Sequence, residues 1–291
     1  KTAAFGLGLL DKLNVKRFRI QTLILCPTRE LADQVSKEIR KLARTIHNIK
    51  VLTLCGGMPF GPQVGSLEHG AHIIVGTPGR IEDHLGRGTL TLDNVDTLVL
   101  DEADRMLEMG FQESLDNIID QIPAERQTLL FSATYPPRIQ QIAERIMNNP
   151  EQVIALSKHD ESSISQHFYK VDDNDTAQRI TALRLLLLTH RPESSVIFCN
   201  TKKDVQEVAN SLSNYGFSVV ALHGDLEQRD RDQTLVQFAN KSASIMVATD
   251  VAARGLDIDN LDAVFNFHIA RDSEVHVHRV GRTGRAGSKG I

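Results

Sequence analysis

The stretch TLVLDEADRM, residues 97–106, indicates how this chain is built. Its first four residues form a short apolar, partly β-branched run, which predicts a strand buried on both faces, as in parallel sheets. The strand ends at Asp101 and Glu102, and a helix-like sequence follows. Ligands of open parallel sheets bind at the carboxyl ends of the strands. We therefore expect a binding site at these two carboxylates.

The same pattern recurs along the chain. The stretch between residues 30 and 46 places apolar residues three or four positions apart, which predicts an amphipathic helix. Strands alternating with helices predict an α/β fold with right-handed crossovers. The other strand-like runs cover residues 22–26, 51–54, 72–76, 128–131, 153–156, 195–199, 219–222, 245–248 and 263–267.

The alternation is interrupted once, by the polar, serine-rich stretch that begins at residue 157. The 291 residues suffice for two hydrophobic cores. We therefore predict two α/β domains with parallel sheets, residues 1–156 and 165–291, joined by a linker over residues 157–164. A long surface loop within one domain is disfavoured, because the full alternation of strands and helices restarts after it.

Composition limits the possible functions. The formal net charge of −4 disfavours binding of nucleic acid by a broad basic face, so any such binding must come from local sites. The three cysteines lie far apart, which favours reduced thiols of a cytoplasmic protein over a zinc site or disulfides. No apolar stretch approaches the length of a membrane span, and we expect no membrane partner.

Asp101 and Glu102 have the chemistry that a nucleoside triphosphatase needs. A carboxylate at a strand end can hold Mg²⁺, usually through water, and a second one can orient an attacking water. Taken alone, the pair has an equally good structural explanation, because acidic residues stabilise helix N-termini.

An ordered set of further motifs removes this ambiguity. Besides DEAD at residues 101–104, the motifs are CPTRELA (26–32), GG (56–57), TPGR (77–80), FSATYP (131–136), FCNTKKD (198–204), HGDLEQRDR (223–231), ATDVAARGLDI (248–258) and HRVGRTGR (278–285). Together they resemble the motifs of the DEAD-box RNA helicases over essentially the whole chain. The resemblance implies two tandem RecA-like domains that close on ATP and a single RNA strand.

In the first domain, the resemblance implies roles for the acidic motif and its partners. Asp101 corresponds to the ligand of Mg²⁺, largely through water, and Glu102 to the catalytic base or to an acid that positions the attacking water. Ser132 and Thr134 match hydroxyls that bridge to Asp104 and couple hydrolysis to domain closure.

In the second domain, the resemblance implies a partner for Asp104, namely His278, and a ribose contact, Asp257. Arg282 and Arg285 match arginine fingers, since a planar guanidinium suits the charge that spreads over the γ-phosphate oxygens. Arg279, Arg282 and Arg285 recur every three residues and would lie near one face of a helix. A solvated basic helix face is the structural alternative.

The resemblance also implies contacts to the RNA backbone. Glycines let a sugar–phosphate chain approach closely, and hydroxyl, arginine and main-chain donors hold phosphates without reading bases. Each position taken singly is an ordinary turn residue, so the inference rests on the whole set. The matching residues are Pro27, Thr28, Arg29, Gly56, Gly57, Thr77, Pro78, Gly79, Arg80, Asn200, Thr201, Gln228, Arg231, Thr249 and Asp250.

The first two residues, Lys1 and Thr2, match the last two of the family's Gly-Lys-Thr phosphate loop. Lys1 would contact the β- and γ-phosphates and Thr2 the Mg²⁺, at the first turn of a helix. We therefore expect the chain to begin inside that motif, to stop before the second domain is complete, and to have little ATPase activity by itself.

Three stretches, among them LCGGMPFGPQ at residues 54–63, resemble a bacterial subgroup whose C-terminal extension is directed to large-subunit ribosomal RNA. The expected function is an ATP-dependent RNA helicase that unwinds short duplexes locally, as a monomer, with the full-length protein acting in ribosome assembly. A DNA helicase and an RNA-binding scaffold without ATPase activity are the alternatives.

Overall fold

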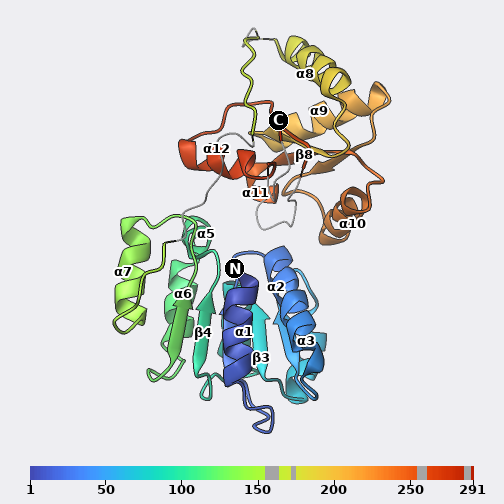
Figure 1. The fold of residues 1–291 in the computed structure, drawn as a ribbon. Coiled ribbons are helices and arrows are strands. Elements are labelled where there is room, and N and C mark those ends of the chain that lie inside the picture. The colour runs from blue at the N-terminus through green and yellow to red at the C-terminus, as the bar shows by residue number, and fades with distance from the viewer. Residues whose placement is uncertain (155–163, 172–174, 254–260, 285–289) are drawn as a thin grey trace. The chain divides into compact units, whose positions relative to one another are not determined.

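The computed structural model describes residues 1–154, 164–171, 175–253, 261–284 and 290–291 (Figure 1). They belong to two compact units, Lys1–Ile154 and Ala155–Ile291. Each unit is built on its own parallel sheet, which confirms the predicted α/β class with two parallel-sheet domains. The predicted linker, 157–164, lies outside the described residues except for Ile164, and its exact bounds remain a prediction.

Unit 1 contains a five-stranded sheet in the order β2-β3-β1-β4-β5. The strands are β1 (Thr22–Leu25), β2 (Val51–Leu54), β3 (Ile73–Gly76), β4 (Thr97–Leu100) and β5 (Gln127–Leu130). The helices are α1 (Thr2–Lys12), α2 (Arg29–Leu42), α3 (Phe60–Glu68), α4 (Pro78–Gly86), α5 (Ala103–Glu108), α6 (Gln112–Ile119) and α7 (Pro137–Ile146), and a 3₁₀ turn, η1, covers Ala43–Thr45.

The strands of unit 1 bury both faces, because helices pack on each side of the sheet. On β1, Leu23 and Leu25 contribute to one apolar cluster with residues of α4, α6 and α7. Ile24, between them, contributes to the other cluster with residues of α1 and α2. Alternate residues of a strand point to opposite faces, and this explains why the strand-like runs are apolar throughout.

Unit 2 contains a four-stranded parallel sheet in the order β7-β8-β6-β9. Its strands are β6 (Ser195–Cys199), β7 (Val219–Leu222), β8 (Ile245–Thr249) and β9 (Ala263–Asn266). Its helices are α8 (Thr176–His190), α9 (Lys202–Asn214), α10 (Gln228–Ala239), α11 (Asp250–Ala253) and α12 (Ser273–Val280). Apolar clusters again lie on both faces.

One predicted strand, 153–156, is wrong where the structure describes it. Val153 and Ile154 belong to no strand and are 82% and 73% exposed. They follow α7 and pair with no described strand, so their apolar side chains are not buried in a sheet. The other predicted strands are confirmed to within one residue at each end. In the parts of the chain described above, no helix has both the length and the apolarity to span a membrane.

Candidate active site and nucleic-acid interface

The predicted site residues of unit 1 follow the carboxyl ends of its strands. The last residues of the five strands are in register, for example Leu25 beside Gly76 and Leu100 beside Leu130. The segments that follow the strands therefore share one edge of the sheet. These segments are 26–29, 55–59, 77–80, 101–104 and 131–134.

At the centre of this edge, Asp101 and Glu102 follow β4. Asp101 is 3% exposed, and its Oδ1 accepts a hydrogen bond of 3.1 Å from the main-chain N–H of Glu102. Burial, and then the neighbouring charge of Glu102, raises the pKa of Asp101 to about 6. A buried carboxylate destabilised in this way is a fitting neighbour for a cation.

Glu102 has a left-handed backbone, with φ of 53° and ψ of 53°. Such a conformation costs a non-glycine residue about 1–3 kcal/mol and is concentrated at functional sites. The Oε2 atom of Glu102 is buried and meets no hydrogen-bond donor among the described residues. This carboxylate oxygen therefore remains able to accept a proton or a hydrogen bond from a bound water.

Lys1 and Thr2 lie at the N-terminus of α1, where main-chain N–H groups have no helical partner and favour phosphate. The positive charge of Lys1 acts to lower the pKa of Asp101. The part of the chain with described side chains holds no group of three or more metal-binding side chains. The Asp101 carboxylate and the Thr2 hydroxyl are oxygen donors, and so few protein ligands fit a Mg²⁺ ion held largely through water and phosphate.

Asp104 connects the acidic motif to the segment after β5. Its Oδ2 accepts hydrogen bonds from the main-chain N–H of Ala133 (3.2 Å) and from the main-chain N–H and hydroxyl of Thr134 (2.9 and 3.0 Å). The main-chain N–H of Asp104 donates to the Ser132 hydroxyl at 3.3 Å. Residues of unit 1 alone therefore bring Asp104, Ser132 and Thr134 together.

Asp104→Asn is expected to lower the free energy of unfolding by about 1–3 kcal/mol at neutral pH, because Oδ1 also accepts from the main-chain N–H of Arg105 at 3.0 Å and an amide has only one accepting oxygen. Burial raises the pKa of Asp104, but hydrogen bonds, those from Thr134 first, outweigh it and hold the pKa below its ordinary value. The stabilisation is therefore complete above the unfolded-state pKa of about 4 and disappears as the pH falls through the folded-state pKa. Urea unfolding at several pH values measures this, with exposed Asp11→Asn as the control. A difference that persists unchanged in acid would contradict it.

The predicted RNA contacts of unit 1 are presented unequally. Gly56, Gly57 and Gly79 are exposed, whereas Pro27 and Pro78 are buried. The Thr28 side chain caps α2, accepting from the N–H of Leu31. The Arg80 side chain is only 13% exposed and donates to the carbonyl oxygen of Met58 at 3.1 Å. Arg29 is also largely covered, with a side-chain exposure of 16%.

The predicted residues of unit 2 likewise follow the strands. Cys199 and Thr249, the last residues of β6 and β8, are adjacent, so Asn200 and Asp250 lie at one edge of the sheet. Thr201 caps α9, its side chain accepting from the N–H of Asp204. Thr249 accepts from the N–H of Ala252 at 3.3 Å.

The other two predicted contacts of unit 2 come from α10. Gln228 donates to Asp232 at 2.9 Å, within the same helix. Arg231 donates to the carbonyl oxygen of Ala252 at 2.7 Å, which connects α10 to α11.

Arg279 is a central residue of this edge that the sequence did not distinguish. Its side chain is 1% exposed, and two of its nitrogens contact both carboxylate oxygens of Asp250 at 2.6 and 2.7 Å. It also donates to Asn266 (2.9 Å), to the carbonyl oxygen of His268 (2.7 Å) and to Asn200 (3.1 Å). One guanidinium thus joins the segments after β6, β8 and β9 to α12. The sequence alone does not single out Arg279, because Arg282 and Arg285 are also arginines and follow it at the same three-residue interval.

The three arginines would lie near one helix face only if their stretch were helical, and the described part of this stretch is helical only as far as Val280. The helix α12 ends at Val280, with Gly281 as its C-cap, so Arg282 lies in the turn beyond the helix. Arg285, and also the predicted ribose contact Asp257, lie outside the described residues. His278 is on α12, and its pairing with Asp104 remains a prediction.

Comparison with known proteins connects both units to helicases. Residues 1–142 match the family profile described as DEAD/DEAH box helicase, and residues 178–287 match that of the helicase conserved C-terminal domain. The chain is 57% identical over its whole length to the ATP-dependent RNA helicase DbpA of Escherichia coli, covering 63% of that protein. This agrees with the bacterial subgroup expected from the sequence. The chain thus spans less than two thirds of this curated relative.

Solved structures give the same result. A DEAD box protein from Methanococcus jannaschii is 41% identical, with a TM-score of 0.54, and the chain covers 77% of it. Dbp5 of S. cerevisiae, in a structure bound to RNA and ADP BeF3, is 28% identical with a TM-score of 0.82, and the chain covers 74% of it. All of this chain aligns with Dbp5, and 99% of it with the M. jannaschii protein.

Proposed function

The chain belongs to the DEAD-box RNA helicase family, and from this premise we propose that it forms the motor part of an ATP-dependent RNA helicase. In this proposal, binding and hydrolysis of ATP are coupled to clamping of one RNA strand and to local unwinding of short duplexes. The observation that supports it most is the arrangement after β4. There, Asp101 and Glu102 lie beside Asp104, which is hydrogen-bonded to the segment 132–134.

The proposed ATP site uses the helix N-terminus of unit 1 and its carboxylates. Lys1 and the first turn of α1 hold phosphates, and Thr2 and Asp101 hold Mg²⁺, with Asp101 acting largely through water. Bound Mg²⁺ neutralises charge on the phosphates. Glu102, with its unpartnered Oε2, orients the attacking water and accepts its proton.

Residues of unit 2 complete the proposed site. Arg282 and Arg285 stabilise the charge that develops during phosphoryl transfer, and Asp257 binds the ribose. His278 pairs with Asp104, so that Ser132 and Thr134, through Asp104, link hydrolysis to closure of the two units. Placing the arginines in unit 2 makes hydrolysis depend on that closure.

The proposed RNA contacts are the strand-end segments of both sheets. Main-chain N–H groups near exposed glycines, together with hydroxyls, hold phosphates without reading bases. Asn200 and Asp250 are hydrogen-bonded to Arg279, and Arg80 is hydrogen-bonded to the loop 55–59. In this proposal the three side chains therefore hold the RNA-binding surface in place in addition to contacting RNA.

A comparison of nucleic acids as activators tests the proposed function. In the full-length protein, single-stranded RNA is expected to stimulate ATP hydrolysis strongly, and DNA of the same sequence weakly. Steady-state ATPase assays over a range of each nucleic acid measure this. Equal stimulation by DNA would favour the DNA helicase instead. Tight RNA binding with no hydrolysis would favour the scaffold.

For the full-length protein we further propose a place in assembly of the large ribosomal subunit, in the cytoplasm and as a monomer. The 57% identity to E. coli DbpA and the match in the stretch 54–63 support assignment to that bacterial subgroup. Ribosomal RNA is then the proposed partner.

A further inference from the structure

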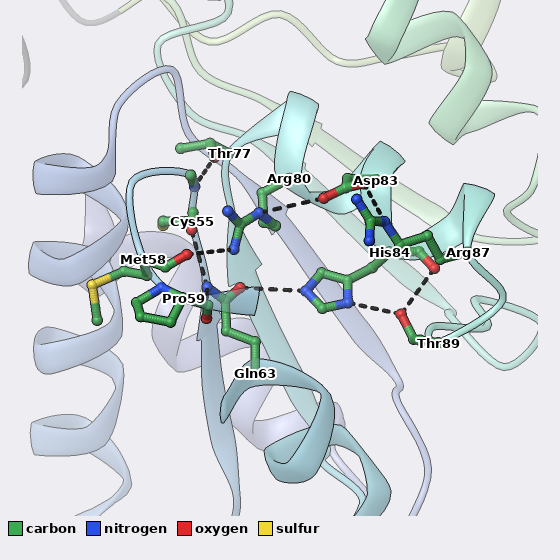
Figure 2. A network of polar contacts seen from close by, with 11 residues as sticks. Cys55, Met58, Pro59, Gln63, Thr77, Arg80, Asp83, His84, Arg87 and Thr89 are labelled. Atoms are coloured by element: carbon green, nitrogen blue, oxygen red, sulfur yellow. Dashed lines mark hydrogen bonds and ion pairs between the residues drawn. The ribbon is translucent and has the colours of Figure 1, made fainter. Parts of the chain in front are cut away.

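Buried, hydrogen-bonded polar side chains in unit 1 connect two of the proposed RNA-contact segments to each other (Figure 2). The first segment is the loop of residues 55–59, which carries Gly56 and Gly57. The second is the start of α4, residues 77–80. The side chains between them, Gln63 on α3 and His84 on α4, are 8% and 0% exposed.

Gln63 holds the loop at both of its ends. Its amide nitrogen lies 3.1 Å from the carbonyl oxygen of Cys55 and 3.5 Å from that of Pro59. Carbonyl oxygens only accept, so the amide nitrogen must face them and Oε1 must face the other way. That oxygen lies 3.3 Å from Nε2 of His84 (Figure 2).

This orientation determines the proton on His84. Because Oε1 of Gln63 accepts, Nε2 of His84 carries the hydrogen. Burial, and then the charge of Arg80, lowers the pKa of His84. The Nδ1 atom of His84 lies 2.8 Å from the Thr89 hydroxyl, which donates to the His84 carbonyl oxygen at 3.1 Å. The hydrogen bonds from His84 to Gln63 and from Gln63 to the Cys55 carbonyl oxygen run in one direction, an arrangement in which each bond strengthens the next.

A second, shorter connection runs beside the first. Arg80 lies one helical turn before His84 and donates to the carbonyl oxygen of Met58, in the middle of the loop. The N–H of Gly56 donates to the Thr77 hydroxyl at 3.4 Å. The ring of Phe60 stacks on His84, with centroids 4.2 Å apart. The loop is therefore held to the start of α4 at Gly56 and Met58, and Gln63 holds both of its ends.

We infer that Gln63 and His84 are positioning residues for RNA binding, which hold the 55–59 loop and the 77–80 turn at the spacing that one RNA backbone requires. The inference rests on the proposed function, because it takes both segments as RNA contacts. Neither residue contacts RNA itself in this scheme. Each acts through main-chain groups of the loop, which must be held rigidly for several weak phosphate contacts to form together.

The chain supplies a matched control in His72. This histidine is also 0% exposed, and it also uses both ring nitrogens, toward the N–H of Lys50 (3.1 Å) and the carbonyl oxygen of Val15 (3.0 Å). It also packs against a phenylalanine, Phe18, with ring centroids 4.7 Å apart. However, His72 directly precedes β3, whereas Thr77 directly follows that strand, so His72 lies at the opposite end of the sheet.

The test compares His84→Phe and Gln63→Leu with His72→Phe in the full-length protein. The first two variants are expected to raise the KM for single-stranded oligouridylate in the ATPase assay, and its Kd, about tenfold, the effect of losing about one buried hydrogen bond. The kcat at saturating RNA should not change. His84→Gln, whose amide can still donate toward Gln63, should recover most of the affinity. Thermal unfolding measures whether each variant is folded. If His84→Phe does not fold, Gln63→Leu alone provides the test.

His72→Phe separates positioning from general stability. It should lower the melting temperature as His84→Phe does, yet leave the KM for RNA unchanged. If all three variants change the KM alike, or if none does, the inference is wrong while the proposed function stands. If the unaltered protein neither binds RNA nor responds to it, the proposed function itself fails.

Discussion

Replacing Glu102 with glutamine is expected to slow ATP hydrolysis by about 10²–10⁴-fold in the full-length protein, the contribution of a positioned general base. The affinities for ATP and RNA should remain, because glutamine keeps the size and shape of the side chain and one of its two acceptor oxygens. The negative charge and one acceptor oxygen are lost, and with them the ability that the buried Oε2 gives Glu102 to take a proton. Single-turnover and steady-state hydrolysis at saturating RNA measure the effect.

Glu108→Gln provides the matched control. It makes the same chemical change at the exposed end of the same short helix, α5. Its hydrolysis rate should equal that of the unaltered protein. Sustained multiple turnover by Glu102→Gln would show that Glu102 is not the base, and a parallel loss of ATP affinity would show that it acts in binding instead.

Replacing Arg279 with alanine is expected to lower the free energy of unfolding of unit 2 by about 3–5 kcal/mol, because it leaves the Asp250 carboxylate without its partner. The lost interactions also include those with Asn200, Asn266 and the His268 carbonyl oxygen. The guanidinium further lies 5.1 Å from the centre of the Phe198 ring. Urea unfolding with hydrogen exchange on β6, β8 and β9 measures the loss and places it in unit 2.

Two further variants show whether the geometry or only the charge matters. Arg279→Lys should recover little, since one ammonium cannot replace a planar group that donates in several fixed directions. Glu193→Ala, which removes the exposed ion pair with Lys241, should leave unfolding nearly unchanged. An Arg279→Ala protein as stable as the Glu193→Ala protein would refute this account of Arg279.

The amino-acid sequence predicted the strands well because each is a short apolar run that is buried on both faces. The exception, 153–156, has the same composition but no neighbouring strand at Val153 and Ile154, and periodicity cannot detect that difference. The positions of the site segments followed from a general property of parallel sheets. Residues that come just after the strands, such as Asp101 and Asn200, gather at one edge whatever the order of the strands.

The sequence by itself therefore determined the α/β class, the two parallel sheets, the family, and which segments lie at the strand ends. Only the tertiary structure decided which side chains at those ends face solvent and which hold the others. Arg279 and Arg282 are equivalent in sequence, yet Arg279 is buried among three strand ends and Arg282 lies beyond the helix. Gln63 and His84 gave no signal, because their hydrogen bonds join α3, α4 and a loop. Such contacts depend on which elements become neighbours when the sheet forms, and local spacing along the chain carries no record of that.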